Sequence, residues 1–323
     1  MAGKETCKVK RNVQKIKWKT LLRLGISAGI IALLLSQIDL RAVLDVISRI
    51  NPLAVALALA SGVAASVCAG MAWAALLGAQ GIHLPVWQTL RMHFVGLFFA
   101  AFTPGGLGGD VARTVRVRQH TGKTVEGGAT VIASRVISLL TLAGMAALAA
   151  ILRADGALRR PALIALGALV LGTAAFWLME QPVMKILSSG PATTPAPFAR
   201  FTRIMREVFG SLYQFKKTPG ALARSGAWML AYQVFGVLPI YLLARGMSLP
   251  MQLLDALSLG AMARFTAFLP ISISGVGVQE GAFVFLFAPL GIAASQALAL
   301  SLLDHVVLTL VPLVGGALYA LDE

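Results

Sequence analysis

Long apolar segments alternate along the chain with short segments that are basic or rich in glycine and proline. The apolar segments cover residues 21–38, 52–79, 85–102, 125–152, 161–179, 221–243, 253–269 and 293–320. A helix needs about 20 apolar residues to cross a bilayer. We therefore expect an all-α polytopic membrane bundle with about eight spans. A further apolar segment, 282–290, is too short to span.

Two of the interruptions are breaks inside apolar sequence. The first is AFTPGGLGGD at 101–110, and the second is AFLPISISGVGVQE at 267–280. Irregular backbone at membrane depth is tolerated only where protein or a water-filled cavity surrounds it. We therefore predict two re-entrant segments, with a plain loop at the membrane surface as the alternative. The residues that break the helices are Pro104, Gly105, Gly106, Gly108, Gly109, Pro270, Gly275, Gly277 and Gly281.

The two breaks resemble each other, which predicts an internal repeat. Pro104 aligns with Pro270, and each proline follows an apolar segment and precedes a long span. The two long spans carry polar groups at similar depths, Arg135 in one and Asp304 with His305 in the other. Broken half-helices at matching positions of two halves indicate a transporter binding site. The sequence leaves open whether the repeat is parallel or inverted, and coincidence of two similar strings is the alternative.

An arginine as deep in an apolar span as Arg135 needs a partner. Arg135 lies roughly 15 Å along its helix at the standard rise. A charge at that depth costs at least about 2.5–3.5 kcal/mol on insertion scales. We predict that an acid compensates it, and the candidates are Asp110, Glu126, Glu280 and Asp304.

Charged residues near the breaks also suit a phosphate group. Arginine binds phosphate through two parallel hydrogen bonds, and Arg113 and Arg116 share a helix face with His120. The alternatives are a solvated basic face, an N-cap role for Asp110, and an Arg264 that only snorkels to the interface. The candidate substrate-binding residues are Asp110, Arg113, Arg116, Arg135, Arg264, Glu280, Asp304 and His305.

Composition supports a membrane protein without a sizeable soluble domain. The 323 residues are 58% hydrophobic and 13% charged, against about 25% charged in soluble domains, and the mean hydropathy is +0.80. The formal net charge is +15. Because the basic residues flank apolar segments, they suit anionic lipid surfaces and orientation signals rather than nucleic acid.

We divide the chain into a basic cytoplasmic tail, 1–19, and a single transmembrane domain, 20–320. Within that domain the repeat units are approximately 52–152 and 221–320. Between them, 198–217 has apolar residues at helical spacing with basic residues among them. This pattern is typical of an amphipathic helix lying in the membrane interface, and a solvent-exposed connector helix is the alternative.

The topology does not close under a count of eight spans. With the tail in the cytoplasm, the basic loops 110–123 and 181–217 both fall outside. Basic loops tend to stay in the cytoplasm. One miscounted span would resolve the conflict, as would arginines that face lipid phosphates or a cavity.

No catalytic constellation accompanies these features. Cys7 and Cys68 offer neither a disulfide framework nor metal-ligand spacing, and neither glycine-rich stretch matches a nucleotide-binding loop. Asp304 with His305 suits either a proton relay or a structural ion pair. We therefore expect no catalytic residues, no cofactor and no metal, and an activity other than that of an enzyme.

The stretches FVGLFFAAFTPGGLGGDVARTVRVRQ, ASRVISLL and ISISGVGVQEGAFVFLF resemble the lysylphosphatidylglycerol synthase transmembrane family of flippase-like integral membrane proteins. The resemblance covers nearly the whole chain and implies a helical bundle with re-entrant segments and lipid translocation. Ser134 stands where the family often has Glu, and Gln279 where Arg is common. The soluble aminoacyl-transferase domain found in some members is absent, so we expect no synthesis of aminoacyl lipids.

The leading hypothesis is a flippase-like transporter of a phospholipid or a lipid-linked precursor of the polyprenyl-phosphate type, in the inner (cytoplasmic) membrane. A membrane-embedded lipid-modifying enzyme and a non-transporting partner of envelope lipid synthesis are the alternatives. The expected partners are membrane lipids and an anionic lipid or lipid-phosphate substrate, with no nucleic acid. A homo-oligomer or an envelope-synthesis enzyme as partner stays open.

Overall fold

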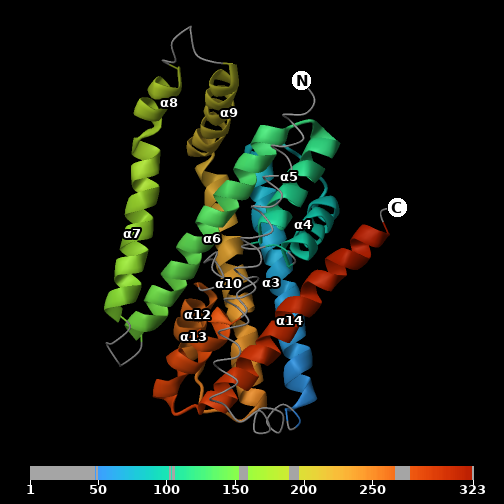
Figure 1. Ribbon diagram of the computed structural model, residues 1–323, viewed down its shortest axis with the longest axis vertical. Coiled ribbons are helices and arrows are strands. Elements are labelled where there is room, and N and C mark those ends of the chain that lie inside the picture. The colour runs from blue at the N-terminus through green and yellow to red at the C-terminus, as the bar shows by residue number, and fades with distance from the viewer. Residues whose placement is uncertain are drawn as a thin grey trace, which may run out of the picture.

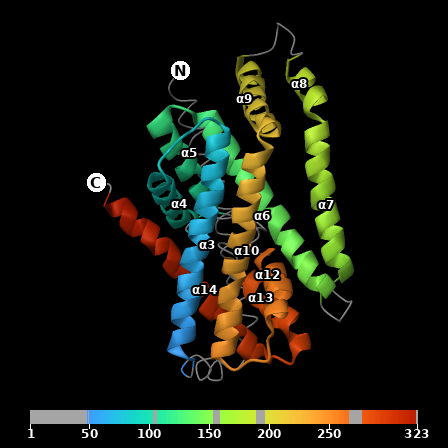
Figure 2. The same cartoon turned by 180° about the vertical axis from the view of Figure 1, so that it is seen from behind.

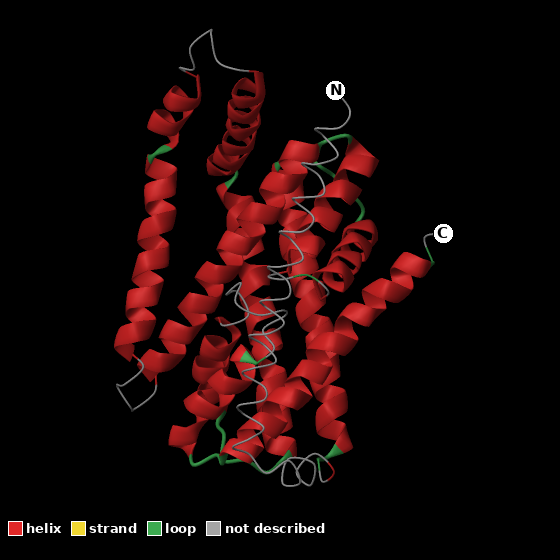
Figure 3. Ribbon diagram, in the orientation of Figure 1, coloured by secondary structure: helices red, strands yellow, loops and turns green. Residues whose placement is uncertain are grey.

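A computed structural model describes residues 48, 50–101, 103, 106–152, 159–188, 196–265 and 277–321. Over these residues every regular element is a helix (Figure 3), which confirms the all-α membrane bundle. The predicted tail and first span lie outside the described residues, as do Pro104, Gly105, Pro270 and Gly275.

Four of the described helices are long and apolar enough to cross a membrane. They are α3 (Pro52–Ala79), α6 (Thr124–Leu152), α10 (Pro219–Gly246) and α14 (Ala294–Ala320). Each has 27 to 29 residues and is therefore about 40 Å long, which exceeds a hydrocarbon core of about 30 Å. Their bounds agree with four of the predicted spans, whereas the count of eight is not confirmed.

The helices α3 and α10 pack side by side in opposite directions (Figure 2). At one end the N–H of Asn51 donates to the carbonyl of Gly246 at 3.4 Å. Midway, Ser61 Oγ donates to the carbonyl of Phe235 at 2.8 Å. Beyond the other end of α3, Gln80 Nε2 donates to the carbonyl of Ser211, in the segment that precedes α10, at 2.7 Å. The start of α3 therefore lies beside the end of α10.

A hairpin of short helices lies between α3 and α6. Helix α4 (Val86–Ala101) packs along α5 (Leu107–Thr121). The 16 residues of α4 extend about 24 Å, which is too short to cross the bilayer. The predicted span 85–102 is therefore one arm of a hairpin of short helices, and an apolar sequence alone does not reveal this difference.

A second hairpin lies between α10 and α14, at the opposite end of the bundle (Figure 1). The first arm of this hairpin begins with the predicted span 253–269, and the described helices of this arm are short. The elements of the hairpin are α11 (Leu253–Asp255), the π-helix η4 (Ala256–Gly260), α12 (Ala261–Phe265), α13 (Val278–Phe287) and η6 (Ala288–Leu290). Figures 1 and 2 show that α6 and α14, which follow the two hairpins, run in opposite directions.

The connection between the two halves is also helical. It contains α7 (Arg159–Leu178), α8 (Glu180–Ser188), α9 (Ala196–Tyr213) and the 3-10 turn η3 (Gln214–Lys217). The predicted amphipathic helix 198–217 therefore exists. In both views, however, α9 runs alongside α8 and close to the direction of α10, not across the bundle (Figures 1 and 2).

The orientation of α9 differs from the predicted one because protein covers part of its apolar stripe. Leu212 and the adjoining Phe215 of η3 are buried, in one cluster with Leu76 of α3 and Ala129 of α6. A stripe that packs against helices does not need a membrane surface to cover it. The prediction that this segment lies in the membrane plane is thus not supported by the arrangement.

Helix α14 joins the second half to the first hairpin. Gly315 lies so close to the carbonyl group of Phe94 in α4 that a Cβ at this position would overlap it. Small residues allow helix backbones to approach in this way. The close crossing fixes α14 against α4, and α14 carries the polar residues of the second half.

Candidate functional site

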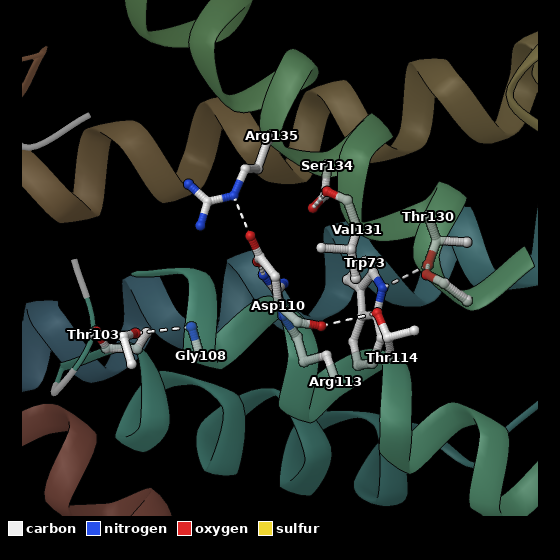
Figure 4. A network of polar contacts seen from close by, with 12 residues as sticks. Trp73, Thr103, Gly108, Asp110, Arg113, Thr114, Thr130, Val131, Ser134 and Arg135 are labelled. Atoms are coloured by element: carbon white, nitrogen blue, oxygen red, sulfur yellow. Dashed lines mark hydrogen bonds and ion pairs between the residues drawn. The ribbon is translucent and has the colours of Figure 1, made fainter. Parts of the chain in front are cut away.

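The first polar cluster forms around Asp110, in the first turn of α5. Arg113 Nη2 donates to Asp110 Oδ1, and Arg135 Nε donates to Asp110 Oδ2, both at 2.6 Å (Figure 4). The side chains of Asp110 and Arg113 are 17% and 15% exposed, and that of Arg135 is 35% exposed. The prediction that an acid pairs with Arg135 is confirmed, and the acid is Asp110.

Local backbone chemistry places Asp110 at this point. Gly106 precedes α5 with a φ of 71°, a left-handed conformation that favours glycine. The N–H of Gly108 donates to Thr103 Oγ1 at 2.8 Å, and Gly109 lies against the carbonyl of Gly96 in α4. The N-cap is therefore Gly106, not Asp110 as one alternative proposed, and the Asp110 carboxylate instead binds two guanidinium groups.

Aromatic rings of neighbouring helices contact Arg113 and Arg116. The guanidinium of Arg113 lies over the ring of Trp73 in α3, 5.5 Å from its centroid. Trp73 Nε1 donates to Thr130 Oγ1 of α6 at 2.9 Å, as Figure 4 shows. Arg116 lies elsewhere, with its guanidinium over the ring of Tyr319 at the end of α14. Of the predicted arginines in this half, the structure therefore groups Arg113 and Arg135 with Asp110 and separates Arg116 from them.

The second polar cluster forms where α12, α13 and α14 meet. Arg264 Nη2 donates to Asp304 Oδ1 at 2.9 Å, and Gln279 Nε2 donates to Asp304 Oδ2 at 3.1 Å. His305 Nδ1 lies 2.9 Å from Glu280 Oε1. The Asp304 carboxylate is fully buried, and that of Glu280 is 5% exposed. Arg264 is thus an ion-pair partner and does not simply snorkel.

The two clusters occupy corresponding places in the two halves. Asp110 and Arg135 are 25 residues apart in the sequence, and Glu280 and His305 have the same separation. Each acid lies in the first turn of the helix after a break. Each partner lies in the long helix that follows. A glycine with positive φ precedes both helices, Gly106 at 71° and Gly277 at 88°.

Some predicted contacts remain predictions. Pro104, Gly105 and 266–276 lie outside the described residues, so a cavity shared by the two breaks remains an expectation. Gly281 lies within α13, and no atom beyond its local backbone approaches the position of a Cβ within 4 Å. It does not mark a close approach.

Several members of these clusters carry no signal of their role in the sequence. Trp73 and Thr103 lie in apolar or loop sequence without a local signal for their bonds. Gln279 was considered only as a departure from a family pattern, although it binds Asp304. His93 of α4 is 5% exposed, and its ring nitrogens have no hydrogen-bond partner among the described residues. Its position beside Arg113 became apparent only from the packing.

A cleft of about 530 Å³ lies away from both clusters, where the start of α6 faces α9. Its lining includes Thr124, Glu126, Arg206, Glu207 and Gln214. Glu126, one of the candidate partners of Arg135, therefore lines this cleft.

The fold and the paired clusters define a multi-pass membrane protein. Each of its two hairpins places charged groups just after a helix break. The family model for the lysylphosphatidylglycerol synthase TM region matches residues 20–316. The chain belongs to this family and is a membrane protein of envelope lipid metabolism. Comparison with curated proteins finds no match.

Proposed function

We propose that the protein moves a phospholipid or a lipid-linked precursor of the polyprenyl-phosphate type across the membrane, in the manner of a flippase. The observation that carries this proposal is the cluster of Asp110 with Arg113 and Arg135. Its one carboxylate and two guanidinium groups sum to one positive charge. Lipid phosphates are anions of the membrane, and arginine binds phosphate through two parallel hydrogen bonds.

The surroundings of the cluster also support anion binding. The start of α5 follows the left-handed Gly106, and a helix N-terminus presents backbone N–H groups to an anion. A Cβ at Gly106 would lie 3.2 Å from Arg135 Nη2. The helix start and the guanidinium are therefore close enough for one phosphate to reach both.

The arrangement of the two hairpins supports transport over catalysis. They enter from opposite ends of the bundle (Figure 1), and α3 and α10, which precede them, are antiparallel. This is the geometry of an inverted repeat, in which alternating access follows from motion of one half against the other. We therefore infer that the repeat units are inverted.

Charge distribution orients the protein in the membrane. The last turn of α5 carries Arg118, the turn between α5 and α6 carries Lys123, and η3 carries Lys216 and Lys217. All of these lie at the end of the bundle where α6 begins (Figure 1). Basic loops tend to stay in the cytoplasm. This end of the bundle therefore faces the cytoplasm when the protein lies in the inner membrane. If 85–102 and 253–269 form hairpins in place of two spans, the basic loops 110–123 and 181–217 no longer fall outside.

The test is lipid movement by the purified protein in liposomes, with fluorescent phosphatidylglycerol and a fluorescent polyprenyl phosphate as separate probes. Wild-type protein should move a probe between leaflets without changing it chemically. Arg135→Ala should abolish movement although the protein still reaches the membrane. Arg135→Lys should also fail, because ammonium does not form the planar two-bond contact.

Arg203→Ala is the control, because Arg203 is 80% exposed and pairs with Glu207 on the surface of α9. This variant should transport normally. Normal transport by Arg135→Ala would show that Arg135 is structural. A chemically altered probe would indicate a lipid-modifying enzyme instead, and a wild type that neither moves nor alters either probe would indicate a non-transporting partner.

A further inference from the structure

We propose that Glu280 and His305, together with Asp304 and Arg264, form a proton-binding site that couples a proton gradient to lipid movement. The coupling rests on the proposed transport function, whereas the proton site stands by itself. The cluster contains two carboxylates, one guanidinium and one imidazole. With a neutral imidazole these groups sum to one negative charge, and a bound proton makes the sum zero.

Because the cluster is buried, its net negative charge is energetically costly. Asp304 is fully buried and Glu280 is 5% exposed. A buried charge is costly in such surroundings unless an opposite charge or a proton neutralises it. Arg264 compensates one carboxylate through Asp304. A proton on the imidazole, 2.9 Å from Glu280, would compensate the second.

The charged groups around the cluster come from three elements. Arg264 belongs to α12, Glu280 to α13, and Asp304 and His305 to α14. These are the charged side chains that act on Asp304, and Gln279 of α13 adds a neutral hydrogen bond. Helices α3, α4 and α10 also pack on α14 but, among the described residues, add no ion pair to this group. The adjoining segment 266–276 contains no ionisable residue.

Comparison of the two halves indicates which residue titrates. In the first half, the partner of the helix-start acid is Arg135, a guanidinium that stays charged at any physiological pH. In the second half the corresponding position holds His305. Histidine is the side chain whose charge changes near neutral pH. The structure thus pairs a permanent cation in one half with a switchable cation in the other.

A proton fits this cluster better than a metal ion. A protonated imidazole and a carboxylate 2.9 Å apart form an ion pair that needs no further ligand. Among the described residues no group of three or more His, Cys, Asp or Glu side chains is placed to hold a metal ion. Sodium is the alternative cation, and the test below separates it from the proton.

The site is also connected to the helix break. The N–H of Gly277, the residue at which the second break ends, donates to Glu280 Oε2 at 2.6 Å. The same carboxylate binds His305 of α14 through Oε1. A change in the charge of His305 therefore acts on the carboxylate that holds the start of α13. This connection makes the proton site a positioning device for the hairpin.

The first experiment measures the proton itself and needs no lipid substrate. Full-length protein with ¹⁵N-labelled histidine has four histidines, and the His305 signal is the one lost in His305→Gln. We expect it to change protonation state between about pH 5 and pH 9. Its midpoint should move by about one pH unit or more in Glu280→Gln, because a neighbouring charge is removed. A His305 signal that does not titrate in this range, or a midpoint unchanged in Glu280→Gln, would overturn the proposal.

The second experiment measures coupling in liposomes that contain fluorescent phosphatidylglycerol. With one proton per lipid, a gradient of one pH unit should change the steady-state ratio between leaflets by about tenfold. His305→Arg retains a cation beside Glu280 but cannot titrate, and its ratio should stay at about one. His83→Gln changes an exposed histidine in the turn before α4 and should behave as wild type.

The outcomes separate the two proposals. A titrating His305 with a ratio that follows the pH gradient in wild type, and not in His305→Arg, supports proton coupling. A ratio that follows sodium, or that ignores the pH gradient, overturns it. If wild-type protein moves no lipid while His305 still titrates, the proposed transport function fails and the proton site stands without it.

Discussion

The ion pair between Arg135 and Asp110 makes a quantitative prediction about stability. Replacing either residue alone leaves a charge without its partner, whereas replacing both removes the charge and its partner together. We therefore expect Asp110→Asn combined with Arg135→Gln to be less destabilising than the sum of the two single changes. Asp110→Asn removes the bond from Arg113 both in the wild-type protein and in Arg135→Gln, so that loss cancels from the comparison.

The structure sets the magnitude of this coupling. The bond from Arg135 Nε to Asp110 Oδ2 is 2.6 Å long, and hydrogen bonds between charged groups contribute about 1.5–3 kcal/mol. The Arg135 side chain is 35% exposed, so water screens part of the attraction. We expect a coupling free energy of about 2 kcal/mol.

The assay is equilibrium unfolding of the purified protein in mixed micelles, followed by tryptophan fluorescence. The matched control is the pair of Arg203 with Glu207, whose side chains are 80% and 45% exposed. Exposed pairs of this kind contribute about 0.3–0.5 kcal/mol. If Asp110 and Arg135 couple no more strongly than the control pair, the pair does not form and the reasoning about this cluster is refuted.

Three further predictions concern packing and topology. Gly315→Val should separate α14 from α4 and lower the unfolding midpoint, whereas Gly144→Ala, with open space around it, should leave it nearly unchanged. Gln80→Leu should destabilise by about 1–3 kcal/mol in the same assay, since it leaves its buried partner on α9 unsatisfied. Lys217→Cys, in η3 just before α10, and Arg245→Cys, in the last turn of α10, should react with an impermeant maleimide from opposite sides of sealed vesicles, in a background without native cysteines. Labelling of both from one side would refute the proposed topology.

The long helices were predictable because their signals are local. Asn51 caps α3 by accepting from the N–H of Leu53 at 2.9 Å, and Pro52 occupies the first helical position. The predicted start at residue 52 is therefore confirmed. Arg135 was also a local signal, since a guanidinium inside an apolar run needs a partner wherever the fold places it.

The Pro and Gly breaks predicted two re-entrant segments, whereas hydropathy did not show that their apolar arms are shorter than full spans. An apolar segment of 16 to 18 residues buries its side chains equally well as a membrane span or as a half-helix packed against other helices. Helix α4 belongs to the second type because it pairs with α5 and crosses α14. Local sequence patterns do not show the crossing with α14, because α14 lies about 200 residues further along the chain.

Partners in the second cluster were hidden for the same reason. Arg264 and Asp304 are 40 residues apart, and Arg264 lies at the end of α12, where an arginine often reaches the membrane surface. Only the packing of α12 against α13 and η4 brings its guanidinium to Asp304. The sequence predicted that these residues were functional candidates, but not which acid each base would meet.

The helix breaks and the buried charges occur together for a structural reason. A helix that begins inside the bundle has backbone N–H groups in its first turn that a continuous helix would satisfy by itself. Side-chain oxygens next to each break accept from such groups, Thr103 from Gly108 in the first half and Glu280 from Gly277 in the second. The acid in the first turn of each new helix then attracts a cation from the following span. Each break thus creates a charged site, and the two hairpins bring these sites in from opposite ends of the bundle (Figure 1).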